Sequence, residues 1–167
     1  MAYDTKELER KSLEAIESIS IEKGCNMISE KFISEKDFVS NILPKLKLII
    51  KTMYGFDVKS IETEKYFNYR DYGYFNVKYD IYITTEQGRD IVIECKNPTH
   101  EKSETFGAIS QIMSYLFICR QLEKEPIVIL ATSKLDFYFF EVLGMFNLKF
   151  DVILNNKNSA AYWINTI

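Results

Sequence analysis

The sequence predicts one domain of the mixed α/β (α+β) class, and three patterns lead to that prediction. Residues 77–98 contain two runs of alternating apolar and polar residues around the break Glu86-Gln87-Gly88, which is typical of a β-hairpin. Residues 35–54 repeat apolar residues at helical spacing, which predicts an amphipathic helix. Residues 126–132, PIVILAT, form a short apolar run that is typical of a buried strand.

The length and composition fit this class. A chain of 167 residues, with 47% hydrophobic and 27% charged residues, suits a single domain over 1–167. The net charge of −3 gives no global attraction to nucleic acid, so such binding would need a local basic patch. No apolar run is long enough to span a membrane. The three cysteines are widely spaced, which predicts reduced thiols in the cytoplasm and no zinc site.

The N-terminal residues predict a helix over 4–23, with Asp4 as its N-cap and Gly24 just past its end. Its apolar positions share one face at helical spacing, and its other face is charged. We expect this element, residues 1–24, to pack outside the core or against a second subunit, and we assign it no chemistry.

The next helix is expected over 35–54, with Ser34 as its cap and a bend or break at Pro44. Glu35 projects into the middle of the apolar arc, where a carboxylate needs solvent or a partner. Two explanations stay open: a favourable charge near the helix N-terminus, or an auxiliary carboxylate that points toward a metal. Lys51 lies on the opposite face, either solvated or touching phosphate. The arc contains Phe38, Val39, Ile42, Leu43, Leu46, Ile49, Ile50 and Met53.

A strand is expected over 58–67, followed by a turn and then by the strand that carries Asp80. Arg70 lies near that turn among several tyrosines. Residues of this kind either stack on unpaired bases or pack the tip of a hairpin.

The hairpin fixes which residues face each other. If Thr85 pairs with Arg89, the ladder places Asp80 opposite Glu94, and period-two alternation puts Lys96 on the same face. The other face is expected to belong to the core, and it carries Val77, Tyr79, Ile81, Ile83, Ile91, Ile93 and Cys95.

This arrangement suggests a metal site. The Cβ atoms of Asp80 and Glu94 would lie ~5 Å apart, where like charges repel unless a cation lies between them. Hard cations such as Mg²⁺ prefer oxygen ligands, and the backbone carbonyl of Cys95 is a candidate third ligand. Lys96 is placed to orient a water or to stabilise negative charge on a phosphate. The alternative is a surface hairpin in which Lys78 and Lys96 neutralise the two acids.

The pattern of Asp80, thirteen intervening residues and then Glu94-Cys95-Lys96 resembles the core motif of the PD-(D/E)XK nuclease superfamily. The resemblance implies a restriction-endonuclease-like fold with an αβββαβ core. The proline that precedes the aspartate in the motif is replaced here by Tyr79.

A third helix is expected from Ser103 to about residue 122, with a main apolar stripe made of Ile109, Ile112, Met113, Leu116 and Phe117. Gln111 and Tyr115 lie one turn apart on a different face. Their Q-x-x-x-Y spacing resembles a motif of RecB-like nucleases and of the N-terminal nuclease domain of type I restriction enzyme R subunits. That resemblance implies that Gln111 lies beside the catalytic residues and that Tyr115 supports it. The residues around Glu35 resemble the first helix of the same domain, which a glutamate opens.

The remaining residues predict more strands. The strand over 126–132 should lie beside the Glu94 strand after a helical crossover. Segments 136–142 and 148–154 suggest a hairpin around Gly144, and 160–167 would close the sheet. The core is therefore expected over 34–140, with a C-terminal extension over 141–167.

Taken together, the resemblance implies a nuclease that hydrolyses DNA phosphodiester bonds with Mg²⁺ or Mn²⁺. Asp80, Glu94 and the Cys95 carbonyl would hold the metal, Lys96 would act on the attacking water, and Gln111 and Glu35 would complete the site. The residues assigned to nucleic-acid contact are Tyr115, Arg70 and Lys51. RNA as substrate, a homodimer and a recruiting protein partner stay open. The competing class is a non-catalytic module that keeps the nuclease fold and binds nucleic acid or protein.

Overall fold

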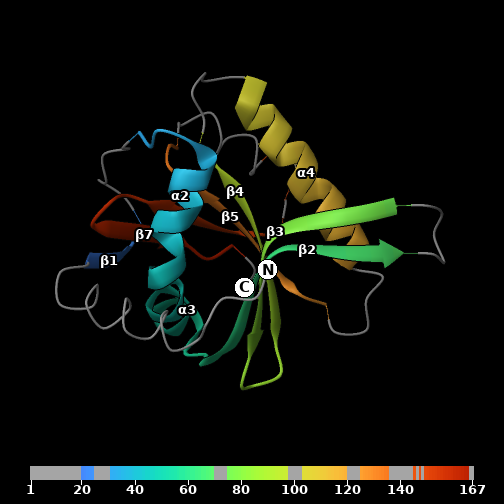
Figure 1. Ribbon diagram of the computed structural model, residues 1–167, viewed down its shortest axis with the longest axis horizontal. Helices are drawn as coiled ribbons and strands as arrows, with labels where there is room; N and C mark the ends of the chain where they lie inside the picture. The colour runs from blue at the N-terminus through green and yellow to red at the C-terminus, as the bar shows by residue number, and fades with distance from the viewer. Residues whose placement is uncertain are drawn as a thin grey trace.

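The computed structural model describes residues 20–24, 31–69, 75–97, 103–119, 125–135, 145, 147 and 149–165. A seven-stranded sheet forms its centre, and helices lie on both sides of it (Figure 1). In chain order the elements are β1 (Ser20–Lys23), α2 (Glu35–Ile42), the 3-10 helix η1 (Leu43–Lys45), α3 (Leu46–Tyr54), β2 (Val58–Tyr69), β3 (Phe75–Thr85), β4 (Asp90–Lys96), α4 (Ser103–Cys119), β5 (Ile127–Thr132), β6 (Asp151–Asn155) and β7 (Ser159–Trp163).

The sheet has the strand order β1-β7-β6-β5-β4-β3-β2. Strands β2, β3 and β4 form an antiparallel meander, and β4, β5 and β6 run parallel to one another. Strand β7 returns antiparallel to β6, and β1 pairs parallel with β7 at the edge. The order from α2 to β5 is that of an αβββαβ core, so the predicted mixed α/β, restriction-endonuclease-like fold class is confirmed.

Two apolar cores lie on opposite faces of the sheet. On one face, the buried residues of α2, η1 and α3 pack against Ile81, Ile83, Ile91 and Ile93. On the other face, the buried residues of α4 pack against strand residues that include Tyr82, Val92, Val128, Leu130 and Val152. Strands β4 and β5 are therefore covered on both sides, which explains their nearly continuous apolar sequences.

The segment 35–54 folds as predicted. The Ser34 hydroxyl accepts a hydrogen bond from the Asp37 amide at 3.1 Å, which caps α2. Pro44 lies in η1, where the helix is interrupted before α3 begins. Gly55 ends α3 with a left-handed φ of 73°. Most of the expected arc is buried, and Val39 is half-buried.

The hairpin of β3 and β4 has the predicted register. Ile81 pairs with Ile93 and Thr84 pairs with Asp90, while the Thr85 amide donates to the Arg89 carbonyl at 3.0 Å. Gly88 takes the left-handed conformation that the turn requires, with φ of 76°.

One expectation about this hairpin is wrong. Val77 and Tyr79 do not share the core of Ile81 and Ile83, because they pack with the α4 side of the sheet. Period-two alternation is broken between Tyr79 and Ile81, at Asp80.

Helix α4 begins at Ser103 as predicted, and β5 lies parallel to β4. The expected apolar stripe is only partly correct, since Met113 is 45% exposed and Phe117 is 67% exposed. Tyr115 is buried in their place, together with Ala108, Ile109 and Ile112. The helix is apolar on several sides, so its periodicity alone left its rotation undecided.

The chain ends differ from expectation. The predicted N-terminal helix is wrong for residues 20–23, which form strand β1 beside β7, and residues 4–19 lie outside the described part. The strand predicted over 148–154 corresponds to β6, but the expected partner at 136–142 also lies outside it. Strand β7 matches the closing strand, so β6 and β7 extend the central sheet. Within the described residues, no helix is long and apolar enough to cross a membrane.

Candidate active site

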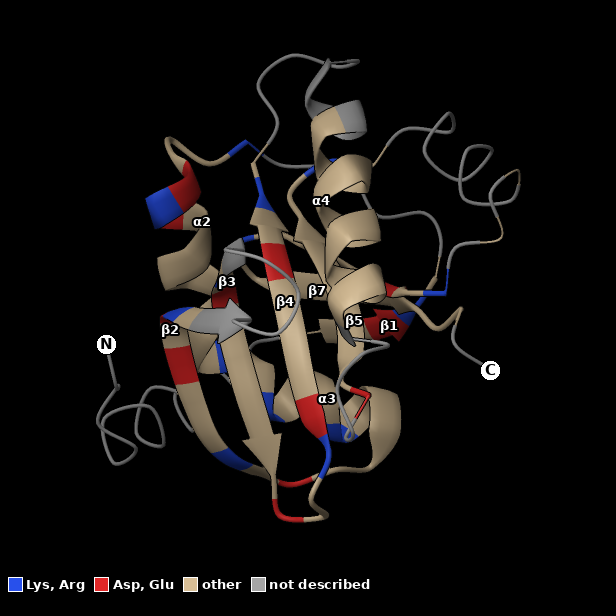
Figure 2. Ribbon diagram, turned by 90° about the vertical axis from the view of Figure 1, so that its right-hand side faces the viewer, with Lys and Arg blue, Asp and Glu red and all other residues tan. Residues whose placement is uncertain are grey.

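The candidate site lies at the carboxyl end of β4. Figure 2 shows this strand with an acidic segment followed by a basic tip, beside α4. Strand β4 ends with Glu94, Cys95 and Lys96, and its parallel pairing with β5 places Glu94 next to Leu130 and Lys96 next to Thr132. Strand β4 is buried on both faces, so the charged side chains in it must find partners within the protein.

Glu94 has a partner for each of its carboxylate oxygens. Oε2 accepts a hydrogen bond from the Tyr115 hydroxyl at 2.6 Å, and Oε1 lies 2.7 Å from the Lys96 ammonium. The Glu94 side chain is only 2% exposed. Two charge-assisted contacts therefore hold the carboxylate in one orientation.

Asp80 lies against the end of the same strand. Its Oδ2 accepts a hydrogen bond from the Cys95 amide at 2.8 Å. Burial, followed by the negative charge of Glu94, raises the pKa of Asp80 from 3.8 to about 7. The prediction that Asp80 and Glu94 lie close together is therefore supported, and their proximity makes the ionised pair costly without a cation.

Lys96 and Glu35 complete the charges around the pair. Burial lowers the pKa of Lys96, but its hydrogen bond to Glu94 and the nearby acids outweigh burial, so the net direction is upward. Glu35 is exposed at the start of α2, and its charge acts on Asp80, Cys95 and Lys96. Its charge therefore reaches the pair, and its place in the first turn of α2 also fits a favourable charge at a helix N-terminus, so both explanations for Glu35 stay open.

The donor set fits a hard divalent cation. Asp80 and Glu94 offer carboxylate oxygens to such an ion. The Cys95 side chain is buried in the core on the side of α2 and α3, so only the Cys95 backbone carbonyl could serve as a ligand. Across the residues that the structure describes, no group of three or more His, Cys, Asp or Glu side chains is arranged to hold a metal. Two carboxylates are nevertheless a common protein contribution for Mg²⁺, which keeps several waters and also binds substrate phosphate.

Helix α4 brings Tyr115 to the site and leaves Gln111 at the surface. Tyr115 is 6% exposed, and its ring packs edge-on against Tyr79 with centroids 4.8 Å apart. Its hydroxyl lies 2.9 Å from the Lys78 carbonyl as well as beside Glu94. Burial and the Glu94 charge raise the Tyr115 pKa. Tyr115 is thus a positioning residue for Glu94 and offers little surface to a nucleic acid, whereas Gln111 is exposed one turn earlier.

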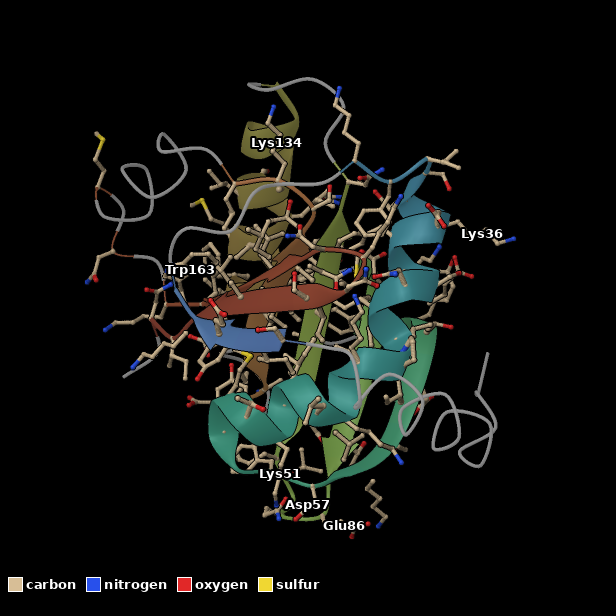
Figure 3. The ribbon with its side chains drawn as sticks, turned by 90° about the vertical axis from the view of Figure 1, so that its left-hand side faces the viewer. Lys36, Lys51, Asp57, Glu86, Lys134 and Trp163 are labelled. Carbon is tan, nitrogen blue, oxygen red and sulfur yellow. The ribbon has the colours of Figure 1, made fainter. Side chains whose placement is uncertain are left out.

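The structure does not bring Lys51 to the site. Its ammonium lies 2.8 Å from Asp57 and 3.3 Å from the Gly55 carbonyl. Asp57 in turn contacts the β3–β4 turn, where its carbonyl accepts from the Glu86 amide. Figure 3 shows these residues at the opposite end of the molecule from Lys134, which follows β5. Arg70, the other basic candidate, lies outside the described residues.

Two polar residues at this end of the sheet were not singled out from the sequence. Asn97 donates from Nδ2 to the Phe32 carbonyl at 3.0 Å and accepts from the Ser133 hydroxyl at 2.7 Å. The Ser133 amide also donates to the Lys96 carbonyl at 3.1 Å. These bonds tie the ends of β4 and β5 to the segment that leads into α2. The available signal was a polar residue directly after each of two apolar strands.

No protein-family model matches this chain, and no curated protein matches it in sequence. Among solved structures, an XisH family protein from Nostoc punctiforme matches with a TM-score of 0.49 and 20% identity, over 72% of this chain and 96% of that one. An EndoMS-dsDNA2 complex matches with a TM-score of 0.48 and 17% identity, over 80% of this chain and 50% of that one.

A repair endonuclease from Pyrococcus abyssi matches with a TM-score of 0.44 and 16% identity, over 74% of this chain and 48% of that one. The chain therefore spans about half the length of the EndoMS and Pyrococcus chains. These similarities are too low to assign a family or an activity to this chain.

Proposed function

We propose that this chain is a metal-dependent nuclease that hydrolyses DNA phosphodiester bonds with Mg²⁺ or Mn²⁺. The observation that carries the proposal is the meeting of Asp80, Glu94 and Lys96 at the carboxyl end of β4. A buried carboxylate pair costs folding energy, so it points to a site that a cation completes. The spacing of these residues resembles the PD-(D/E)XK motif, and that resemblance makes DNA the first substrate to test.

Each residue has a distinct part in this mechanism. Asp80 and Glu94 would hold the metal through their carboxylates, with the Cys95 carbonyl as a further ligand. A metal held there would supply Lewis-acid chemistry at the scissile phosphate and would lower the pKa of the attacking water. Lys96, released from Glu94, orients that water and stabilises negative charge on the phosphate. Glu35 supplies an auxiliary carboxylate.

The helix residues contribute from the other side. Tyr115 keeps Glu94 oriented through its hydroxyl. Gln111, exposed one turn away, is expected to contact the substrate. The role of Tyr115 follows from its hydrogen bond to Glu94, and that of Gln111 from the Q-x-x-x-Y resemblance, which places the glutamine beside the catalytic residues.

The test is cleavage of supercoiled, linear and single-stranded DNA, and of RNA, in Mg²⁺, Mn²⁺ or EDTA. Asp80→Asn and Lys96→Met should abolish metal-dependent cleavage. Asp57→Asn and Lys51→Met are matched controls, because this exposed ion pair lies at the other end of the molecule. Loss of cleavage in the control variants as well would contradict the assigned site.

The second candidate function is a non-catalytic module that binds nucleic acid or a protein partner. The observation that favours it is the ion pair of Lys96 with Glu94, which already neutralises one of the two acids. Such a module would bind DNA equally well in Mg²⁺ and in EDTA and would cleave none of the substrates. Metal-dependent DNA affinity without cleavage would instead indicate a missing partner or a different substrate.

A further inference from the structure

A half turn in the ribbon of β2 and β3 lies directly beside the candidate site. Thr63 pairs with Ile81 and Lys65 pairs with Tyr79, so Glu64 and Asp80 are the single residues between these two pairs and neither strand has an extra residue there. Glu64 nevertheless has a left-handed backbone, with φ of 52°. Among the described residues, it is the one non-glycine residue within a strand that has a positive φ. Such a conformation costs energy and is kept only where the surrounding structure demands it.

The side chains show that the ribbon turns over at this point. Before it, Ile61 packs in the same core as Ile81, on the side of α2 and α3. After it, the Lys65 ammonium lies 2.7 Å from Glu62 and 4.3 Å from the centre of the Tyr82 ring, on the α4 side. In a regular strand, residues 62 and 65 would lie on opposite faces. The left-handed residue between them reverses the faces.

The half turn also changes the pairing between β3 and β4. Thr85 and Arg89 form a hydrogen-bonded pair, and so by alternation do Ile81 and Ile93. A regular continuation would make the Cys95 amide donate to the Tyr79 carbonyl. The regular pairing instead ends at Ile81 and Ile93, and the Cys95 amide donates to the Asp80 carboxylate. The turn thus brings Asp80 over the end of β4.

The half turn also affects Glu94, through Tyr79 and Tyr115. Because the ribbon has turned, the fully buried ring of Tyr79 lies against Tyr115 on the α4 side. The Tyr115 hydroxyl then reaches both the Lys78 carbonyl and Glu94. Both candidate metal ligands are therefore oriented by the half turn.

We propose that the left-handed backbone of Glu64 is a positioning element that aims Asp80 and, through Tyr79 and Tyr115, Glu94 at a shared metal ion. The proposal rests on the proposed function for the metal ion, but the geometric claim stands without it. The backbone conformation carries this role. The Glu64 side chain forms only an exposed ion pair with Lys78, at 2.8 Å, and such pairs contribute little.

The test replaces Glu64 by residues that differ in their tolerance of a positive φ. Glu64→Val cannot adopt the conformation without strain, Glu64→Ala adopts it at a lower cost, and Glu64→Gly adopts it freely. Glu125→Val is a matched control, because Glu125 is also a left-handed glutamate, with φ of 36°, outside the strands and before the start of β5. The two valine variants should lose similar stability, so stability alone does not distinguish them.

The first readout needs no metal. Hydrogen exchange of the Cys95 amide, measured by NMR relative to the Ile93 amide, should accelerate in Glu64→Val and stay at the wild-type value in Glu64→Gly and Glu125→Val. The second readout is Mn²⁺ affinity, followed by the EPR signal of the free ion. We expect the Mn²⁺ affinity to fall roughly 10- to 100-fold in Glu64→Val, as for other residues that orient metal ligands. Glu64→Gly and Glu125→Val should keep the wild-type affinity.

The outcomes separate the two proposals. If Glu64→Val folds too poorly, Glu64→Ala takes its place and should show the same changes at smaller size. Unchanged Cys95 exchange in the strained variant, or a loss of Mn²⁺ affinity in Glu64→Gly as large as in Glu64→Val, would overturn the role of the Glu64 backbone. Wild-type protein that binds no Mn²⁺ would overturn the proposed function, while the exchange data would still decide the geometric claim.

Discussion

At the scale of single residues, the site is defined by how Glu94 and Asp80 are held. Glu94 is fixed by Tyr115 and Lys96, whereas Asp80 is held by the amide of Cys95 and kept near a second carboxylate. Because its pKa is raised to about 7, Asp80 in the metal-free protein holds a proton below about pH 7, and a cation would displace that proton.

This proton makes metal affinity depend on pH. Because the pKa of Asp80 is about 7, Mn²⁺ must compete with the proton below that pH, and affinity should rise about tenfold per pH unit up to pH 7 and then level off. Isothermal titration calorimetry in buffers of different ionisation enthalpy would measure both the affinity and the released proton. Affinity that stays constant from pH 5 to pH 7 would contradict the prediction.

The Tyr115 hydroxyl gives a second test. In Tyr115→Phe the ring still packs on Tyr79, but Glu94 loses its 2.6 Å hydrogen bond. We expect Mn²⁺ affinity to fall roughly 10- to 100-fold, with a stability loss of about 1–2 kcal/mol in urea denaturation. Tyr66→Phe is the matched control, since Tyr66 is 68% exposed on β2, and it should change neither quantity. An equal effect in both variants would show that Glu94 does not depend on Tyr115.

At the scale of elements, features that depend on neighbouring residues could be predicted from the sequence, whereas strand pairings between distant residues could not. Ser34, Pro44 and Gly88 act within a few residues of themselves, so the cap, the break and the turn could be predicted from the sequence. Strand β1 could not be predicted, because Ser20 pairs with Ser159 far along the chain and four residues carry little pattern of their own.

In the candidate site, too, the locally determined features were predicted and those that depend on another strand were not. Asp80, Glu94 and Lys96 were predicted because the hairpin register is local and period-two alternation is strict on β4. The exchange of faces at Tyr79 was missed, because the left-handed residue that causes it lies on another strand and is a glutamate. For Lys51 the structure agrees with the solvated alternative, and the phosphate alternative could not be judged from the sequence, because helical spacing gives the face of a residue and not the end of the sheet that it reaches.

The connection between elements can be tested at Asn97. Its amide links Phe32, before α2, to Ser133, after β5, so Asn97→Ala should leave the lead-in to α2 less firmly held and lower stability by about 1–3 kcal/mol. A double-mutant cycle with Ser133→Ala should give a coupling energy of about 0.5–3 kcal/mol, because the two side chains lie 2.7 Å apart. Additive free energies of unfolding would mean that the two residues act independently.

At the scale of the whole molecule, Asp80, Glu94 and Lys96 meet at the end of the sheet where β4 and β5 finish. The other end of the sheet holds the β3–β4 turn and the Lys51–Asp57 ion pair, which are exposed to solvent. Two other buried acids, Asp90 and Asp151, lie where β4 and β6 begin, and each accepts a hydrogen bond from a tyrosine hydroxyl. Asp80 and Glu94 instead place two carboxylates near each other, and the cost of this pairing should be visible in the stability of the entire fold.

Asp80→Asn should therefore stabilise the metal-free protein. The folded-state pKa of Asp80 lies above its unfolded value of 3.8, so ionisation weakens the fold progressively from about pH 4 to pH 7 and fully above that. In EDTA at about pH 8, urea denaturation should show the variant to be more stable than wild type by about 1–3 kcal/mol, and the gap should close near pH 4.

Added Mg²⁺ should reverse this order, because the ion binds the folded wild type and not the variant. Asp57→Asn is the control, since Asp57 is exposed and its pKa is lowered by Lys51, so neutralising it should bring no gain at any pH. If Asp80→Asn were less stable than wild type in EDTA at high pH, the carboxylate pair would be a structural contact that supports the fold. A lower stability of this kind would remove the main reason for placing a metal ion between Asp80 and Glu94.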